Sequence, residues 1–203
     1  MKTVFMFPGQ GSQSIGMMAS LLEEFEVARQ VFDEASEAIG VDLKEIALHG
    51  PEDQINQTAI TQPIVLAASI AMWRVWESQT DFKPDFVCGH SLGEYSALVA
   101  SGVLELKDAV RLVHLRGSLM QDAVPMGEGG MAAILGLDEA SVELACEEAA
   151  QGSVVAAANY NSPGQVVISG ASEALERAMI IAKEKGAKRA AKLPVSVPCH
   201  CDL

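Results

Sequence analysis

Apolar and polar positions follow two different periods along the chain, and their order predicts an α/β fold. Apolar runs of strand length occur at residues 3–7 and 86–88. Between them, residues 27–39 and 61–77 repeat apolar side chains at helical spacing, and a further helical stretch follows at 107–123. A strand, helices and a second strand in this order predict a parallel sheet with right-handed crossovers.

A second pattern begins after a glycine-rich break at residues 125–130. The elements expected after it are a strand at 131–135, a helix at 139–150, strands at 154–158 and 166–169, a helix at 172–185 and a strand at 188–195. This βαββαβ order is that of the ferredoxin-like motif. We expect residues 1–125 to begin a large α/β domain, residues 126–194 to form an inserted ferredoxin-like small domain, and residues 195–203 to return to the large domain.

The segment Gly89-His90-Ser91-Leu92-Gly93 lies between the second apolar strand and a helical stretch that ends near Gly102. Gly-x-Ser-x-Gly between a strand and a helix is the pattern of a nucleophile elbow, in which a tight turn exposes the serine hydroxyl. The free N–H groups at the start of the helix point toward whatever bonds to that oxygen. We therefore expect Ser91 to be a nucleophile.

The first strand ends in a second glycine-rich loop, Gly9-Gln10-Gly11-Ser12-Gln13. The carboxyl ends of strands are where open α/β sheets bind ligands. The loop lacks the glycine spacing of a dinucleotide fingerprint and the lysine of a P-loop. It is either an ordinary tight turn or a source of exposed backbone N–H groups, with that of Gln10 among them.

A serine nucleophile needs a base, and the chain has four histidines. His90 adjoins Ser91, but neighbouring side chains at a sharp turn point apart. His200 follows Pro198 where the chain is expected to return to the large domain, so we expect it to be the base. Arg116 lies on or near the apolar face of the helix at 107–123, where it is either paired with a structural acid, extended to water, or held for a substrate carboxylate.

The composition describes a globular chain of 203 residues, 49% hydrophobic and 20% charged. No apolar run approaches the ~20 residues that a spanning helix needs, and residues 1–8 do not form a signal peptide. We expect a cytoplasmic protein with no membrane partner. The four cysteines do not form a disulfide framework in a chain of this size, and Cys199-His200-Cys201 lacks a second ligand pair, so no metal site is expected.

The net charge of −13 argues against general nucleic-acid binding. One stretch near the end is basic, and it is either a solvated helix face or a docking patch for an acidic partner. Its basic residues are Arg177, Lys183, Lys185, Lys188, Arg189 and Lys192.

Four motifs in order resemble the malonyl-CoA:acyl carrier protein transacylases of fatty acid synthesis and the related acyltransferase domains of polyketide synthases. They are residues 8–13, residues 89–94, Leu115-Arg116-Gly117, and Val195-Ser196-Val197-Pro198-Cys199-His200. The resemblance implies a parallel-sheet, hydrolase-like large domain with a ferredoxin-like insert. It also implies that malonyl-CoA and the phosphopantetheine thiol of acyl carrier protein are the substrates, with no cofactor.

The resemblance implies a role for each matching residue. Ser91 carries the acyl group and His200 serves as general base and then acid. The backbone N–H groups of Gln10 and Leu92 form the oxyanion hole, and Arg116 pairs with the malonyl carboxylate. The side chains expected to line the same pocket are Gln62, Asn161 and His90. The basic patch becomes a docking surface for acyl carrier protein, which is acidic.

Two other functions stay open at this point. A serine thioesterase or hydrolase of the α/β-hydrolase type shares Gly-x-Ser-x-Gly, and a non-catalytic module could bind a carrier protein by its basic face. Family members continue for about a hundred residues after the matching histidine, which implies that this chain is C-terminally truncated. Either malonyl or methylmalonyl is compatible with the motifs.

Overall fold

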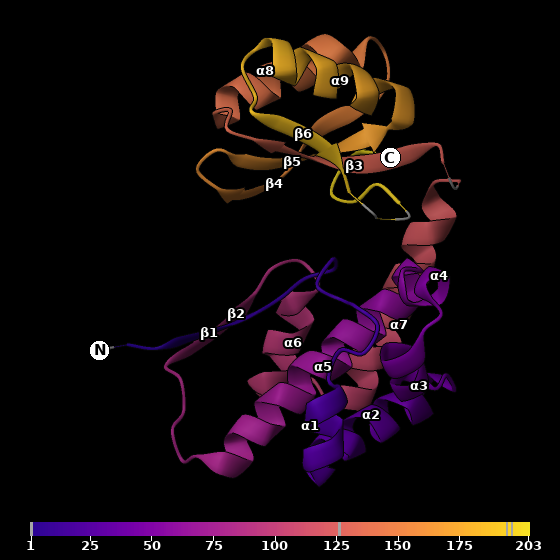
Figure 1. Cartoon of the computed structure of the whole chain (residues 1–203), viewed down its shortest axis with the longest axis vertical. Coiled ribbons are helices and arrows are strands. Elements are labelled where there is room, and N and C mark those ends of the chain that lie inside the picture. Colours follow the sequence, from indigo (N-terminus) through magenta and orange to yellow (C-terminus); the bar gives the residue numbers. More distant parts are fainter. Residues whose placement is uncertain (1, 126, 194, 196) are drawn as a thin grey trace. The chain divides into compact units, whose positions relative to one another are not determined.

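The computed structural model describes residues 2–125, 127–193, 195 and 197–203 (Figure 1). The chain forms two compact units, Met1–Ser118 and Leu119–Leu203, and each is described by itself. A long helix crosses the boundary between these units, so the boundary does not mark the end of a domain. The division expected at 1–125, 126–194 and 195–203 stays a prediction, and residues 126 and 194 lie outside the described part of the chain.

The first unit is mainly helical, with a short two-stranded sheet. Its elements are β1 (Val4–Phe7), α1 (Ala19–Glu24), α2 (Glu26–Ile39), α3 (Leu43–His49), α4 (Glu52–Ile55), α5 (Thr58–Gln79), β2 (Phe86–Gly89), α6 (Gly93–Ala100) and α7 (Leu106–Ala123). Strands β1 and β2 pair in parallel, as the order of elements predicts. Helices α1 and α4 were not expected, because each is shorter than two turns and carries little periodicity.

The sheet of the first unit packs on α5 by one face only. Phe5 and Phe7 of β1 contact the ring of Trp73 edge to face, at centroid distances of 5.5 and 6.2 Å. Side chains alternate across a strand, so the intervening residues point to the other face, where Met6 is 77% and Phe86 52% exposed. An apolar run such as residues 86–88 suggests a buried strand, but β2 is only partly covered within this unit.

Helix α5 forms the centre of the core of the first unit. It begins at Thr58, so Pro63 lies inside the helix rather than in its first turn as expected. Proline cannot donate to the carbonyl four residues earlier, that of Ala59. This carbonyl instead lies 2.8 Å from Nδ1 of His114 on α7. The imidazole thus takes the position of the backbone donor that proline lacks, and this contact joins α7 to α5.

The same helix is long and apolar enough to cross a membrane by length and composition, with a mean hydropathy of 1.2 over its most apolar window. Within the structure, however, 78% of that window is buried. Apolar side chains of α2, α3 and α7 enclose it in one cluster. This is the environment of a core helix.

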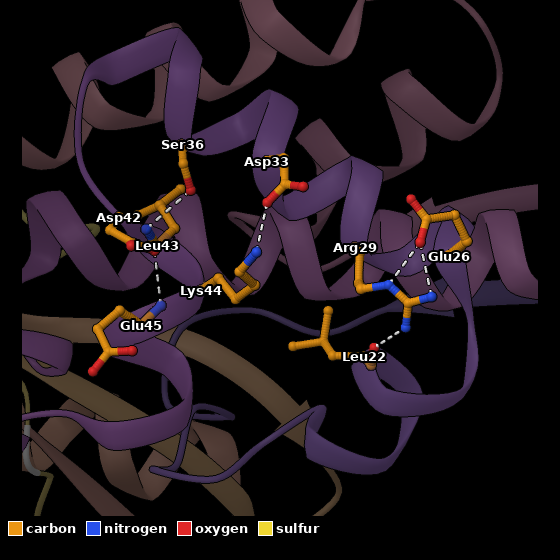
Figure 2. A network of polar contacts seen from close by, with 9 residues as sticks. All are labelled: Leu22, Glu26, Arg29, Asp33, Ser36, Asp42, Leu43, Lys44 and Glu45. Atoms are coloured by element: carbon orange, nitrogen blue, oxygen red, sulfur yellow. Dashed lines mark hydrogen bonds and ion pairs between the residues drawn. The ribbon is translucent and has the colours of Figure 1, made fainter.

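Polar contacts tie α2 to the elements on either side (Figure 2). Lys44 at the start of α3 donates to Asp33 of α2 at 2.7 Å, and the backbone N–H of Leu43 donates to the Ser36 hydroxyl at 3.1 Å. Asp42 caps α3, because its carboxylate accepts from the N–H of Glu45 at 2.9 Å. These bonds fix the turn between α2 and α3.

The second unit has the predicted βαββαβ order. Its elements are β3 (Gly129–Leu135), α8 (Glu139–Ala150), β4 (Val155–Ser162), β5 (Gln165–Ala171), α9 (Ser172–Glu184) and β6 (Arg189–Lys192). The strands pair in the order β4-β5-β3-β6, and every neighbouring pair is antiparallel. Helices α8 and α9 cover one face of this sheet, where their apolar side chains form a second core (Figure 1).

Two expected boundaries in the second unit are wrong. Residues 159–164 were expected to be a loop, but β4 continues to Ser162 and only Pro163 and Gly164 turn the chain into β5. Gly164 has φ +74°, which a glycine adopts without strain, so a two-residue connection suffices. The last strand ends at Lys192, and its expected extension to residue 195 passes residue 194, which is not among the described residues.

The buried position of α5 predicts how the first unit responds to truncation of its side chains. We expect Ile70→Ala to lower the free energy of unfolding by about 2–5 kcal/mol, because the Ile70 side chain is fully buried and leaves a cavity. Met72 on the same helix is 46% exposed, and Met72→Ala should change it by less than about 1 kcal/mol. Urea unfolding measures both, and equal losses would contradict the packing described here.

Candidate functional site

Ser91 lies in a tight connection between β2 and α6. Its φ of +52° is in the left-handed region, which a residue with a side chain adopts only at a cost. Two glycines make the turn possible. A Cβ added to Gly89 would lie 1.9 Å from the carbonyl carbon of Gly93, and one added to Gly93 would lie 2.2 Å from the carbonyl oxygen of Phe7. No side chain larger than hydrogen fits at either position, so the backbone of β1, β2 and α6 can converge on Ser91.

The guanidinium of Arg116 lies beside the serine hydroxyl. One terminal nitrogen of Arg116 donates to Oγ of Ser91 at 3.2 Å, and the other donates to Oε1 of Gln62 at 2.7 Å. Arg116 is half-buried and forms no ion pair with any acid in the described part of the chain. The sequence left open whether Arg116 pairs with a structural acid, and no described residue is such an acid. Ser91, Arg116 and Gln62, all predicted site residues, lie together.

The packing of α7 on α5 sets the position of Arg116. Gly117 follows it in the sequence, and a Cβ there would lie 2.6 Å from both Cα of Ala59 and the carbonyl oxygen of Thr58. Together with the contact between His114 and the Ala59 carbonyl, this close approach fixes where α7 crosses the first turn of α5. The guanidinium then reaches both Gln62 and Ser91.

The loop that contains Gln10 is held by side chains at the start of α5 and just before it. Nε2 of Gln10 donates to the hydroxyl of Thr58 at 3.2 Å, and Nε2 of Gln13 donates to Oδ1 of Asn56 at 2.9 Å. A Cβ on Gly9 would lie 2.9 Å from the carbonyl oxygen of His90, so this loop lies directly against the serine turn. The expected oxyanion-hole donors, the N–H groups of Gln10 and Leu92, thus belong to neighbouring segments of one unit.

Sequence reasoning missed three residues that shape this site. Tyr95 lies under Arg116, with the guanidinium carbon 5.8 Å from its ring centroid. Its position four residues after Ser91 places it one helical turn away, which was a usable signal. Thr58 and Asn56 carried no signal in the sequence, because they lie more than 40 positions from the loop and contact it only once the chain has folded.

The remaining predicted residues lie in the second unit. Asn161 is exposed on β4, and His200 is exposed on the segment after β6, where its φ is +58°. This segment lies against the sheet of its own unit, since Pro198 packs on Gly129 of β3. Because Ser91 and His200 belong to different units, their pairing stays a prediction.

The structure divides the basic patch into two groups. Arg177 donates to the carbonyls of Ala149 and Ala150 at the end of α8, and Lys185 and Lys192 pair with Glu148 and Glu176 at 2.7 Å. These three residues therefore have structural contacts. The other three are exposed and form no ion pair with any residue that the structure describes; they are Lys183, Lys188 and Arg189.

No group of three or more metal-ligating side chains occurs among the described residues. The four cysteines are free thiols. Burial in the core of the second unit, with smaller contributions from Glu143 and Glu147, raises the pKa of Cys146 to about 11. A thiol with this pKa is protonated near neutrality and is no candidate for a nucleophile. The contact between Ser91 and Arg116 is therefore the candidate reactive arrangement in the first unit.

Known proteins of similar sequence identify the family to which this chain belongs. A family model described as "Acyl transferase domain" matches residues 4–202. The malonyl CoA-acyl carrier protein transacylase of Salmonella typhimurium is 56% identical over 199 residues, which are 98% of this chain and 64% of that protein. That of Haemophilus influenzae is 54% identical over 203 residues, all of this chain and 65% of that protein.

Solved structures of similar proteins match nearly the whole of this chain. The malonyl CoA-acyl carrier protein transacylase of Coxiella burnetii matches with a TM-score of 0.95 at 51% identity, over 97% of this chain and 62% of that one. A malonyl-transacylase in complex with its type II polyketide synthase acyl carrier protein matches with a TM-score of 0.95 at 54% identity, over 98% of this chain and 64% of that one.

The chain therefore spans less than two thirds of the length of the curated relatives it matches. The family match extends over nearly all of it and includes both units. It covers the serine turn, Arg116 and the segment that carries His200. The chain belongs to the acyl transferase domain family.

Proposed function

We propose that this chain is the serine-bearing part of a malonyl-CoA:acyl carrier protein transacylase of fatty acid biosynthesis. The observation that carries the proposal is the hydrogen bond between the Arg116 guanidinium and Oγ of Ser91 at the nucleophile elbow. A cation beside the acyl-accepting oxygen suits an acyl group that ends in a carboxylate. The curated relatives are malonyl CoA-acyl carrier protein transacylases, which supports malonyl as that group.

The reaction proceeds in two half-reactions through a covalent intermediate. Oγ of Ser91 attacks the thioester carbonyl of malonyl-CoA while His200 takes the hydroxyl proton. The carbon–sulfur bond then breaks, and His200 returns that proton to the departing thiolate, which leaves malonyl-serine and free coenzyme A. In the second half-reaction His200 deprotonates the phosphopantetheine thiol of the carrier protein, whose sulfur attacks the ester. The serine leaves with the proton.

Each half-reaction passes through a tetrahedral oxyanion, for which we assign the backbone N–H groups of Gln10 and Leu92 as donors. Among the described residues neither N–H donates to a protein acceptor. Loss of one such donor costs about 3–4 kcal/mol of transition-state stabilisation in other acyl-transfer enzymes. The Gln10 loop is anchored to Thr58, which keeps its backbone close to the serine turn.

Substrate selection follows from Arg116. Malonyl places its free carboxylate two carbons beyond the ester carbonyl, within reach of a guanidinium that already contacts the serine oxygen. Gln62 accepts from the same guanidinium and holds its plane. We assign His90 and Asn161 to the lining of the pocket, and no cofactor or metal to the reaction.

We also propose that the complete protein continues its large, hydrolase-like domain beyond this chain, with the second unit as the small domain. Two observations support this. The relatives are about half as long again as the matched segment. The first unit also exposes apolar surface that a larger sheet would cover, at Val4, Met6 and Phe86. Leu112, Leu115 and Leu119 form a similar exposed stripe on α7.

The proposed partner is acyl carrier protein, docked through the exposed part of the basic patch. A similar transacylase was solved in complex with its acyl carrier protein, which supports such a docking. Within the basic patch, Lys183, Lys188 and Arg189 are exposed and form no ion pair with any described residue. A cytoplasmic location accords with this function, and neither nucleic acid nor membrane enters the proposal.

Incubation of the full-length protein with malonyl-CoA tests the nucleophile. We expect one malonyl mass on the peptide that contains Ser91, detected by mass spectrometry after quenching in acid, and no adduct in Ser91→Ala. Ser101, near the end of α6, provides the matched control, and Ser101→Ala should keep the adduct. Release of free malonate without transfer to carrier protein would indicate a hydrolase, and binding of carrier protein with no adduct in the wild type would indicate a non-catalytic module.

Replacement of Arg116 tests the selection of malonyl. We expect Arg116→Ala to lower kcat/KM for malonyl-CoA by an amount equivalent to about 2–4 kcal/mol, since the carboxylate is left without its partner. Acetyl-CoA has no such carboxylate, so transfer of acetyl should change little. Equal losses for both thioesters would refute this role of Arg116.

Removal of charge from the basic patch tests the docking surface. We expect the double variant Lys188→Gln, Arg189→Gln to raise KM for acyl carrier protein by about tenfold at low salt, with KM for malonyl-CoA unchanged. Lys44→Gln with Lys107→Gln removes two charges from the first unit and should leave both values unchanged. An equal rise of KM in the two double variants would rule out a specific patch.

A further inference from the structure

We propose that Ser169 is a positioning residue that holds the backbone on both sides of His200 and so fixes the imidazole for its proton transfers. This inference rests on the proposed function, in which His200 is the general base. It concerns contacts within the second unit alone, and Ser169 belongs to none of the motifs that the sequence analysis singled out.

Ser169 lies near the middle of the second unit's sheet. It is on β5, opposite Met131 of β3 and Ala156 of β4, and its side chain is fully buried. The preceding residue, Ile168, belongs to the core under α8 and α9, so the Ser169 side chain points to the opposite face of the sheet. A hydroxyl buried there needs hydrogen-bond partners from outside the sheet.

The segment around His200 provides these partners. The N–H of Cys199 donates to Oγ of Ser169 at 3.0 Å, and this hydroxyl donates to Sγ of Cys201 at 3.5 Å. A serine hydroxyl can donate one hydrogen bond and also accept, and here it does both. One side chain therefore connects to the residue before and the residue after His200.

The backbone conformation of His200 explains why these hydrogen bonds are needed. Its φ of +58° is uncommon for a residue with a side chain, and such a conformation persists where the surroundings determine it. Pro198 is held at the same time, because it packs on Gly129, where a Cβ would lie 2.6 Å from Cγ of the proline. The Ser169 bonds and this contact together hold the two residues before the histidine and the one after it.

A general base works only within hydrogen-bond reach of the proton that it takes, and a displacement of about 1 Å can cost about a hundredfold in rate. Loss of the Ser169 hydroxyl leaves the N–H of Cys199 without its acceptor and the sulfur of Cys201 without its donor. The backbone at His200 can then relax from its left-handed conformation. The malonyl carboxylate is assigned to Arg116 of the first unit, which Ser169 does not contact, so the proton-transfer steps should suffer more than substrate binding.

The test uses Ser169→Ala in the full-length protein. We expect kcat for malonyl transfer to fall about tenfold, the equivalent of one lost hydrogen bond, with KM for malonyl-CoA within about twofold of the wild type. The NMR signal of the His200 Cε1 proton should also shift or broaden in the absence of substrate. Ser172→Ala, which removes a serine bond to the carbonyl of Gly127 in the same unit, is the matched control and should leave kcat and the histidine signal unchanged.

Ser169→Cys is the second variant, because a thiol is close in size to the hydroxyl and forms only weak hydrogen bonds. It should fold if the alanine variant does not, and should show the same loss of kcat. A kcat equal to that of Ser172→Ala, or a rise in KM without a fall in kcat, would overturn the role of Ser169. Failure of the wild type to form malonyl-serine would instead overturn the proposed function, and an unchanged His200 signal in Ser169→Ala would overturn this inference independently of activity.

Discussion

The site of the first unit depends on the contact between backbones at Gly89 and Gly93. Gly89 lies against the carbonyl carbon of Gly93, and Gly93 lies against the carbonyl of Phe7, at distances that exclude a Cβ. The contact forces β2 to turn into α6 within three residues and leaves Ser91 in the left-handed region. Everything else at the site is arranged around the hydroxyl that this turn exposes.

A second constraint aligns the long helices with that hydroxyl. Pro63 leaves the carbonyl of Ala59 without its helical donor, and the ring of His114 takes this position at 2.8 Å. Gly117 lets the two helices approach closely at the same point. Two features that weaken a helix in isolation, an internal proline and a glycine, therefore determine where Arg116 meets Gln62 and Ser91.

Much of this arrangement could be predicted from residues that act locally. The α/β class, the βαββαβ order of the second unit and the turn at Ser91 follow from periodicity, glycine spacing and caps such as Asp42 and Asp138. The start of α5 was predicted at residue 61 instead of Thr58, because Pro63 favours a position in the first turn of a helix and nothing local shows that His114 compensates for it. The exposure of Phe86 was also unforeseen, since a short apolar run does not reveal which of its faces is covered.

The polar contacts at the site join segments that are far apart in the sequence. Residues 62 and 116 are 54 positions apart, 59 and 114 are 55, and 10 and 58 are 48. Closing each of these loops costs chain entropy that only the assembled core compensates. In a chain emerging from the ribosome, the guanidinium can therefore reach Ser91 and Gln62 only after α7 has been synthesised and has packed on α5.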